Sequence, residues 1–548
     1  MRNWLIRNKK ILLLGFVLFY LYFRGAGDHG LIDPVEGINA SVSLHMFAGG
    51  NYFVPRIGDS LTAGRSIGTW WLYALALKIF GWGEFAVRFW SALSGLGLVL
   101  AAGLSGGYNS DLNSGYYYGD YDYEEFELKH EYPRRSAWLS AYICAGMTGC
   151  FAVSQIASSH AVFSCLTAFA MMFILRSRSN KNWLIGAHFV SVLAFSAHGP
   201  ESLILTWLSV IVYASLCEDW ALLKDFFTWP AGIITAIIMI GIYLLIMVTF
   251  NPNILHFMRC QNHIYSFGGF SGIMIAAFMN FVPYHGFLLR AVWEVLPDNY
   301  PAEKSPELFM LIWALIFAVG SFASGDVMTI AATLPALSAI LGRRLDVWLK
   351  QKKLSSINIA VVMNILILVP ALYVLLPFSL RVYPMFRASL MSLIPWGLMA
   401  GLFIYATWYY TRTKQTVKWA RNVPAAALLC LMPLAGIFNL TSEVYSIRDI
   451  GLKLRDIIQG NDKVIQYGVN YPSVYFYTLR NSELIGTPLT PGVDDWQFTT
   501  DDERLHALWD RKERIFLIIP ADMNPKKPLP KNIFHIIQAE GMLLLSNQ

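Results

Sequence analysis

The chain has 548 residues, of which 55% are hydrophobic, 15% aromatic and only 14% charged, and its mean hydropathy is +0.46. A soluble globule cannot bury so much apolar surface, so the composition excludes a soluble protein and indicates an integral membrane protein. The net charge of +6 does not indicate a nucleic-acid-binding protein, because the basic residues cluster at the ends of apolar runs, as the positive-inside rule describes.

Apolar runs long enough to cross a hydrocarbon layer of roughly 30 Å predict about thirteen transmembrane helices. The first follows the basic stretch MRNWLIRNKK and resembles a signal peptide, but no convincing cleavage site follows, so we interpret it as an uncleaved span. The predicted spans lie near residues 11–24, 84–105, 137–157, 160–176, 183–199, 201–217, 230–250, 270–288, 307–323, 328–342, 357–377, 392–410 and 423–440.

The basic clusters predict the orientation of the chain in the membrane. With the N-terminus in the cytoplasm, the well-marked basic loops all fall on the cytoplasmic side, and an odd number of spans places the C-terminus outside. These clusters are Arg176, Arg178 and Lys181, then Arg343, Arg344, Lys350, Lys352 and Lys353, and finally Arg412, Lys414, Lys418 and Arg421.

The predicted organisation is a membrane module over residues 1–440 followed by a small α/β domain over residues 441–548 on the outer face. The module includes an outer-face loop at 25–83 and a tyrosine-rich and acidic loop at 106–136, which the span count assigns to the cytoplasm. In 441–548, strand-like apolar runs such as RIFLIIP alternate with helical ones such as DDERLHALWDRK, which is typical of an α/β fold.

Metal or disulfide sites are not indicated by local spacing. The six cysteines form no CxxC motif and the acids and histidines show no recognisable ligand spacing, so the sequence indicates no disulfide framework and no metal motif, and it leaves a divalent-metal requirement open. The cysteines lie mostly in apolar runs: Cys144, Cys150, Cys165 and Cys430 are inside such runs, Cys217 ends one and Cys260 is in a loop.

The stretch DPVEG opens the outer-face loop and contains two carboxylates three positions apart. Asp33 can cap a helix over residues 35–48, and Glu36 can reach back to the cap amide, which is a capping box. Alternatively, Glu36 lies at the start of an interfacial helix, where a lipid-borne substrate presents its polar head. The residues expected to lay that helix on the membrane are Ile38, Val42 and Met46.

The run from DPVEG through GGNYFVPRIG to TWWLYALALKIFGWGEFAVRFWSAL resembles the first outer loop of the GT-C membrane glycosyltransferases. It is most similar to the branch that holds the bacterial lipid A aminoarabinose transferase and the protein O-mannosyltransferases. Further segments, SAHGP, HFMRCQNHIYSF and IQYGVNYPSVYFYTLRN, resemble later parts of the family, so the resemblance covers essentially the whole chain. It implies an all-α polytopic GT-C fold with a small C-terminal α/β domain.

The resemblance also implies a reaction and a site in the bacterial inner membrane. A polyprenyl-phosphate sugar donates its sugar at the periplasmic face, and an acceptor hydroxyl displaces the lipid phosphate with inversion. On this basis we expect Glu36, with Asp33 nearby, to act as general base, while Arg65 holds the donor phosphate. Arg259 and His263 are further phosphate-binding candidates.

Several charged positions of the family are altered here. The family Asp of the acidic pair falls on Val35, and its other charged positions fall on or near Arg65, His160, His198, Ser266 and Asp326. Three of these, His160, His198 and Asp326, are possible substrate contacts, although a neutral histidine at a helix end is also a common packing residue. The changes indicate either a remodelled substrate site or lost chemistry.

Two other functions therefore remain open. The first is a non-catalytic relative that binds polyprenyl lipid, supported by the loss of the family Asp at Val35. The second is a lipid or sugar transporter, which fits less well because transporters place ionisable residues mid-span and contain internal repeats. The sequence identifies neither the sugar nor the acceptor, which we expect to be a lipid, an envelope glycan or a protein, and it indicates no certain cofactor.

Overall fold

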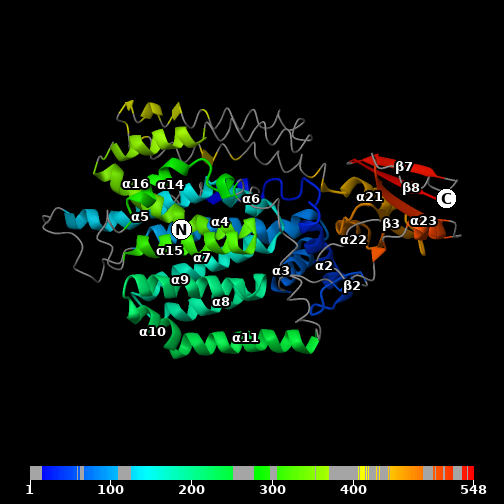
Figure 1. Cartoon of the computed structure of the whole chain (residues 1–548), viewed down its shortest axis with the longest axis horizontal. Helices are drawn as coiled ribbons and strands as arrows, with labels where there is room; N and C mark the ends of the chain where they lie inside the picture. The colour runs from blue at the N-terminus through cyan, green and yellow to red at the C-terminus, as the bar shows by residue number, and fades with distance from the viewer. Residues whose placement is uncertain are drawn as a thin grey trace, which may run out of the picture.

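The computed structural model of the chain is mostly helical and is elongated. A helical bundle occupies one end and a small β-sheet the other, with helices α2 (Val35–Gly49) and α3 (Ile67–Phe80) between them (Figure 1). The structure describes residues 15–58, 60–61, 67–108, 125–250, 274, 277–296, 305–351, 353, 355–368, 445–485, 498–499, 502–509, 513–521, 533–539 and 541–548, and isolated positions between 401 and 442.

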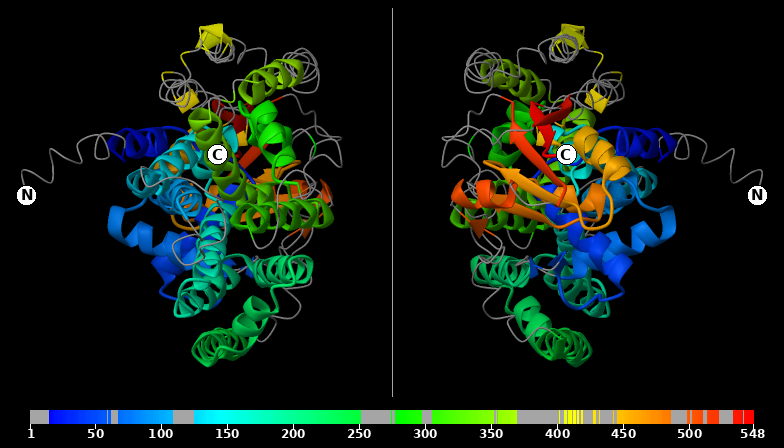
Figure 2. Two further views of the ribbon diagram at one scale, coloured as in Figure 1. Left: turned by 90° about the vertical axis from the view of Figure 1, so that its left-hand side faces the viewer. Right: turned by 90° about the vertical axis from the view of Figure 1, so that its right-hand side faces the viewer.

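Most helices of the bundle overlap the predicted apolar runs. They are α4 (Glu84–Gly106), α5 (Glu125–Ala145), α6 (Thr148–Gln155), α7 (Ser159–Ser177), α8 (Trp183–His198), α9 (Glu201–Leu216), α10 (Trp220–Thr228), α11 (Pro230–Phe250), α14 (His285–Trp293), α15 (Pro306–Ser324), the 3₁₀ helix η4 (Val327–Thr333) and α16 (Leu334–Lys350). Figure 2 shows α11 at the edge of the bundle, where its apolar side chains are largely exposed, as expected for a lipid-facing helix.

Four predicted segments differ from the structure. The predicted span 270–288 ends inside α14, which continues to Trp293, and the predicted span 328–342 is divided between η4 and α16, which continues to Lys350. The predicted span 137–157 is broken, because α5 and α6 meet at a bend of 58°. The end of the predicted cytoplasmic loop 106–136 is helical, since α5 begins at Glu125, and the strong helix formers in EFELKHE explain this early start. Most of that loop, and the predicted spans 392–410 and 423–440 except for isolated positions, lie outside the described residues.

In the described part of the chain, three helices are long and apolar enough to cross a membrane, namely α4, α7 and α15. Two bent pairs, α5 with α6 and α10 with α11, raise that number to five if each pair is one span. Helices α8 and α9 have 16 residues each, about 24 Å at 1.5 Å per residue, which is shorter than the hydrocarbon layer. The count of about thirteen spans therefore stays a prediction.

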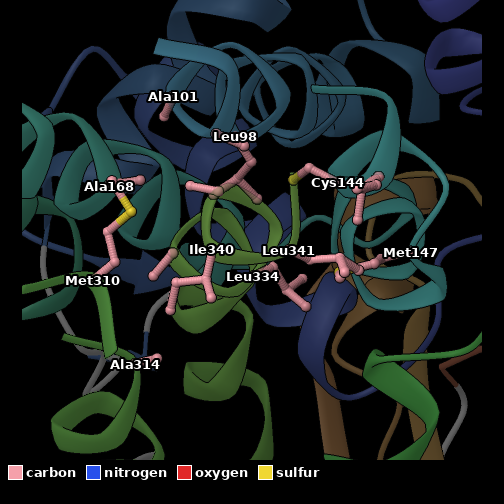
Figure 3. Close-up of a cluster of buried hydrophobic side chains, with 14 of the residues drawn as sticks. Leu98, Ala101, Cys144, Met147, Ala168, Met310, Ala314, Leu334, Ile340 and Leu341 are labelled. Carbon is pink, nitrogen blue, oxygen red and sulfur yellow. The ribbon is translucent and has the colours of Figure 1, made fainter. Parts of the chain in front are cut away.

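Small residues allow the central helices to approach closely. A Cβ added at Gly342 on α16 would lie 2.1 Å from the Ser140 Oγ on α5, and one at Gly106 on α4 would lie 2.0 Å from the same atom. Helix α5 therefore lies against both neighbours at a distance that larger residues would prevent, as in many membrane bundles. The same three helices contribute Leu98, Cys144 and Leu341 to a cluster of buried apolar side chains (Figure 3).

The C-terminal segment forms a six-stranded sheet in the order β5-β4-β3-β6-β8-β7. The first four strands in this order pair in parallel and the last two antiparallel. The elements are α21 (Arg448–Ile457), β3 (Lys463–Tyr467), α22 (Ser473–Thr478), β4 (Ser482–Ile485), β5 (Phe498–Thr499), α23 (Asp502–Trp509), β6 (Ile515–Pro520), β7 (Phe534–Ala539) and β8 (Met542–Ser546). The expected mixture of strands and helices is present, and its independence as a domain stays a prediction.

Alternating side chains of the sheet divide between two cores. Val464 and Phe516 face α21 and α22, whereas Ile465 and Leu517 face α23. The first of these cores continues without a break into α2, α3 and the start of α4. The sheet is thus joined to the membrane module through α2.

Helix α2 begins at Val35 as predicted, but it does not lie on the membrane. Its apolar side chains Ile38, Val42 and Met46 are at most 3% exposed and pack within the core shared with α3 and α22. The Ser41 Oγ also donates a hydrogen bond of 2.7 Å to the Pro472 carbonyl. The prediction of an interfacial helix is therefore wrong, because the protein itself covers the apolar face.

Candidate functional site

A buried ion pair joins the DPVEG stretch to helix α4. The Arg88 Nε and Nη2 donate to the two oxygens of Glu36 at 2.8 and 2.6 Å, and both side chains are fully buried. The remaining guanidinium hydrogens point to backbone carbonyls of Ala26, His29 and Gly30 at 2.8 to 3.0 Å. This bidentate geometry is the strong form of an arginine–carboxylate contact.

The Glu36 carboxylate also accepts two backbone hydrogen bonds, from the Ile32 amide at 2.8 Å and the Ala157 amide at 2.7 Å. Burial raises the pKa of Glu36, but the charge and hydrogen bonds of Arg88 outweigh it and leave the pKa below its ordinary value. The role of general base stays a prediction for Glu36. To accept a proton from a substrate, the carboxylate would first have to lose one of the hydrogen bonds that it accepts from Arg88, Ile32 or Ala157.

The capping box predicted for Asp33 and Glu36 does not form. The N-cap of α2 is Pro34, no side chain caps this helix, and Glu36 reaches back to the Ile32 amide instead. The Asp33 carboxylate accepts from the amide of Ser473 at 3.1 Å and from the Ser473 hydroxyl. Ser473 is the first residue of α22, and the first amides of a helix need acceptors. Asp33 therefore accepts a hydrogen bond from the N-terminus of a helix 440 positions further along the chain.

The predicted phosphate-binding residues Arg65, Arg259 and His263 lie outside the described residues, as does Ser266. Val35, where the family Asp is expected, is buried at the start of α2. The catalytic and phosphate-binding roles assigned from the sequence therefore stay predictions.

The three remaining predicted positions come together. His160 lies in the first turn of α7, His198 is the last residue of α8, and Asp326 is the N-cap of η4. One side-chain ligand atom from each lies within 4.8 Å of the other two, and all three residues are buried. The His160 Nε2 is 3.5 Å from the Asp326 Oδ2, and the two imidazole rings are 4.8 Å apart between centroids.

Neighbouring groups orient the members of this His–His–Asp cluster. The Ser159 Oγ is 3.2 Å from the His198 Nδ1, and the Glu201 Oε2 is 3.7 Å from the His198 Nε2. The Met328 amide donates to the Asp326 Oδ1 at 3.1 Å, which turns the other carboxylate oxygen toward His160. Contacts from outside the cluster thus orient His198 and Asp326.

A short segment connects the cluster to the buried ion pair. Ala157 donates its amide to Glu36 and accepts from the Asn39 side chain at 2.9 Å, while Ser159 and His160 contribute to the cluster. Residues 157–160, at the start of α7, therefore connect the two features.

Two parts of this arrangement were not identified from the sequence. Arg88 stands inside the apolar run EFAVRFW, and a charged residue at such a place signals a buried partner. The His–His–Asp cluster could not be found by spacing, because its members come from three separate elements.

Comparisons with known proteins agree with this architecture. No family model matches the chain. It is 22% identical to an uncharacterised protein of Aquifex aeolicus, over 97% of this chain and the full length of that one. It is also 25% identical to an undecaprenyl phosphate-alpha-4-amino-4-deoxy-L-arabinose arabinosyl transferase 2 of Pseudomonas fluorescens, over 67% of this chain and 61% of the transferase.

Solved structures extend the likeness to the whole fold. Apo ArnT from Cupriavidus metallidurans superimposes with a TM-score of 0.73 at 16% identity, covering 100% of this chain and 98% of ArnT. The same ArnT bound to undecaprenyl phosphate gives a TM-score of 0.72 at 15% identity, with 99% and 98% covered. The resemblance expected from the sequence is therefore confirmed, and the chain has the GT-C fold of the lipid A aminoarabinose transferase branch of membrane glycosyltransferases.

Proposed function

We propose that the protein is an inverting glycosyltransferase that moves a sugar from a polyprenyl-phosphate carrier to an acceptor at the outer face of the bacterial inner membrane. The observation that carries this proposal is the likeness in fold, over the full length, to a transferase solved with undecaprenyl phosphate bound. The acceptor class is a lipid A-like molecule, an envelope glycan or a protein.

The reaction needs a base for the acceptor hydroxyl and cations for the departing phosphate. We assign the base to Glu36 or Asp33 and the phosphate contacts to Arg65, with Arg259 and His263 as further contacts. Arg65 suits this task because a guanidinium binds phosphate oxygens in a bidentate manner. Both carboxylates are buried and hydrogen-bonded, so the proposal includes a local opening of the contacts around α2 when substrate binds.

We place the N-terminus in the cytoplasm and the C-terminus in the periplasm. The basic clusters support this orientation, because with the N-terminus inside they all fall on the cytoplasmic side; Arg343, Arg344 and Lys350 belong to one of them. A reporter that is active only outside the cytoplasm should work when fused after Gln548 and stay silent near Arg343; activity near Arg343 would overturn the orientation.

The direct test uses membranes that contain the full-length chain and a labelled undecaprenyl-phosphate sugar. Extracted lipid A, envelope glycan and secreted proteins serve as acceptors in parallel, and mass spectrometry identifies the product. Label should move to one acceptor class and depend on Arg65, since Arg65→Ala should lower transfer roughly ten- to thousand-fold and Arg65→Lys should recover part of it. Wild-type kinetics in Arg65→Ala would remove this residue from the site.

The rival function, a non-catalytic relative that binds polyprenyl lipid, is favoured by Val35 at the family Asp position. Val35→Asp restores the acidic pair and tests this rival in the same assay. If neither the wild type nor Val35→Asp forms a glycosylated product, while both bind the labelled lipid, the non-catalytic function replaces the enzyme.

A further inference from the structure

We infer that His160, His198 and Asp326 form a binding site for one divalent transition-metal ion, for which Zn²⁺ is the best match. Three kinds of observation carry this inference: the convergence of the ligand atoms, the chemical type of the donors, and the hydrogen bonds that orient them. None of these depends on the glycosyltransferase function proposed above.

The ligand atoms already lie close to the spacing that an ion requires. A tetrahedral zinc ion with bonds of about 2.0 to 2.1 Å holds neighbouring ligand atoms about 3.4 Å apart. The His160 Nε2 and Asp326 Oδ2 are separated by 3.5 Å, and all three ligand atoms lie within 4.8 Å of one another. The His198 nitrogen is the third of these atoms and closes the triangle within the same limit.

The donor types narrow the choice of ion. Two imidazoles and one carboxylate are the ligands that Zn²⁺ and other first-row transition metals accept, whereas Mg²⁺ and Ca²⁺ prefer oxygen ligands alone. Three protein ligands leave one position of a tetrahedral ion for water or a substrate oxygen. The Glu201 Oε2 lies 3.7 Å from the His198 Nε2, so Glu201 can supply that fourth ligand instead.

Neighbouring groups orient the ligands as they do in known metal sites. A metal-bound histidine usually has its second nitrogen engaged by a hydrogen bond, which fixes the tautomer and the ring. The Ser159 Oγ occupies that place at the His198 Nδ1, and the Phe163 ring stacks on the same imidazole at 4.3 Å between centroids. The Met328 amide does the same for the Asp326 carboxylate.

The burial of the three ligands also favours the binding of a cation. His160 and His198 are at most 2% exposed and Asp326 is 3% exposed, so a carboxylate charge is held where solvation is poor. A bound divalent cation compensates that charge and binds the imidazole lone pairs at the same time. The site also links α7, α8 and η4, so an ion would fasten three helices at one end of the bundle.

The test measures metal binding on the purified full-length protein in detergent, without donor or acceptor. After treatment with a chelator and its removal, the wild type should take up one Zn²⁺ per chain by mass spectrometry of metal content, and Co²⁺ should give a visible absorption band. His160→Gln, His198→Gln and Asp326→Asn should each weaken binding at least about a hundredfold. His188→Gln is the matched control, because this buried histidine of α8 binds the Phe226 carbonyl elsewhere.

Ser159→Ala guards against a loss of binding that merely reflects misfolding. It removes a neighbouring hydrogen bond but no ligand, so it should weaken Zn²⁺ binding roughly tenfold while the protein elutes and melts as the wild type does. The inference is overturned if the wild type binds no more Zn²⁺ than His160→Gln, or if His188→Gln loses as much as the cluster variants. Because no sugar transfer is measured, a negative result leaves the proposed transferase standing, and an inactive transferase leaves the metal site standing.

Discussion

The Glu36–Arg88 pair and the His–His–Asp cluster are both buried and polar, but their charges are arranged differently. In the first, the Glu36 carboxylate is paired with the Arg88 guanidinium and also accepts hydrogen bonds from two backbone amides. In the second, one carboxylate and two imidazoles bring their ligand atoms within 4.8 Å of one another. Two buried polar groups that share residues 157–160 thus form a structural link in one case and, as we infer, a ligand site in the other.

The difference shows why burial of a charged residue is a poor guide to its role. When one partner of a buried ion pair is removed, the other charge is left unpaired and the folded protein loses stability. A convergent set of donors gains most when a further cation arrives. Substitutions that separate folded protein from activity or binding can therefore test the distinction, and they are ordered below by expected effect.

The largest effect is expected from Arg88→Met. This change leaves the Glu36 charge buried without its main partner, and breaking a buried pair in this way costs about 3 to 5 kcal/mol. Thermal unfolding in detergent should show a greatly lowered midpoint or little folded protein. The double variant Glu36→Gln with Arg88→Met is the control and should recover part of the loss, because no unpaired charge remains; a wild-type melting curve for Arg88→Met would contradict the structural role.

Glu36→Gln sharpens the comparison because it separates the two roles predicted for this carboxylate. The amide oxygen still accepts one backbone hydrogen bond, but Arg88 loses its counter-charge, so we expect a cost of about 1 to 3 kcal/mol in the free energy of unfolding. A general base would add a second effect, a fall of at least roughly a hundredfold in transfer per folded molecule. Unchanged transfer per folded molecule would leave Glu36 with the structural role alone.

The sequence predicted the helices well where the signal extends over many residues. The run predicted at 84–105 is α4, and the one predicted at 307–323 is α15, because many apolar positions together determine a span. Features that depend on one contact were missed. The partner of Glu36 lies 52 positions away and the acceptor for the start of α22 lies 440 positions away, and packing alone brings them together. Local rules predicted a capping box there instead.

The same reasoning applies to the candidate site. The altered family positions pointed to His160, His198 and Asp326 one at a time, but only the fold shows that they meet. Their separation along the chain removes every spacing signal that short metal motifs provide. A buried partner for Arg88 could have been predicted, because this cation lies inside an apolar run.

Asp33→Ala should have a smaller effect, confined to the junction between α2 and α22. It removes the acceptor for the Ser473 amide and hydroxyl, and losing such a helix-end acceptor costs about 1 to 2 kcal/mol. Limited proteolysis should then release the C-terminal segment sooner. Asp33→Asn keeps an acceptor oxygen and should behave nearly as the wild type; equal protease sensitivity of Asp33→Ala and the wild type would show that other contacts hold the junction.

The smallest effect concerns His29, whose backbone carbonyl binds Arg88. Burial, and next the charge of Arg88, lower the pKa of the His29 imidazole to about 4 from 6.5. Between these two values the unfolded chain binds a proton that the folded chain does not, so stability falls as the pH decreases through this window. Glu36 adds little there, because its lowered pKa removes stability only at lower pH.

The expected loss from His29 between about pH 7 and about pH 5.5 is about 1 kcal/mol in the free energy of unfolding. His29→Gln has no group that titrates in this range, so its melting midpoint should fall less over the same interval than that of the wild type. Both proteins are compared at several pH values in one detergent, and the difference between their slopes is the measured quantity, because other titrating groups contribute equally to both. Identical slopes would mean that His29 can be protonated within the folded protein, and that the enclosure around Arg88 is open to water on that side.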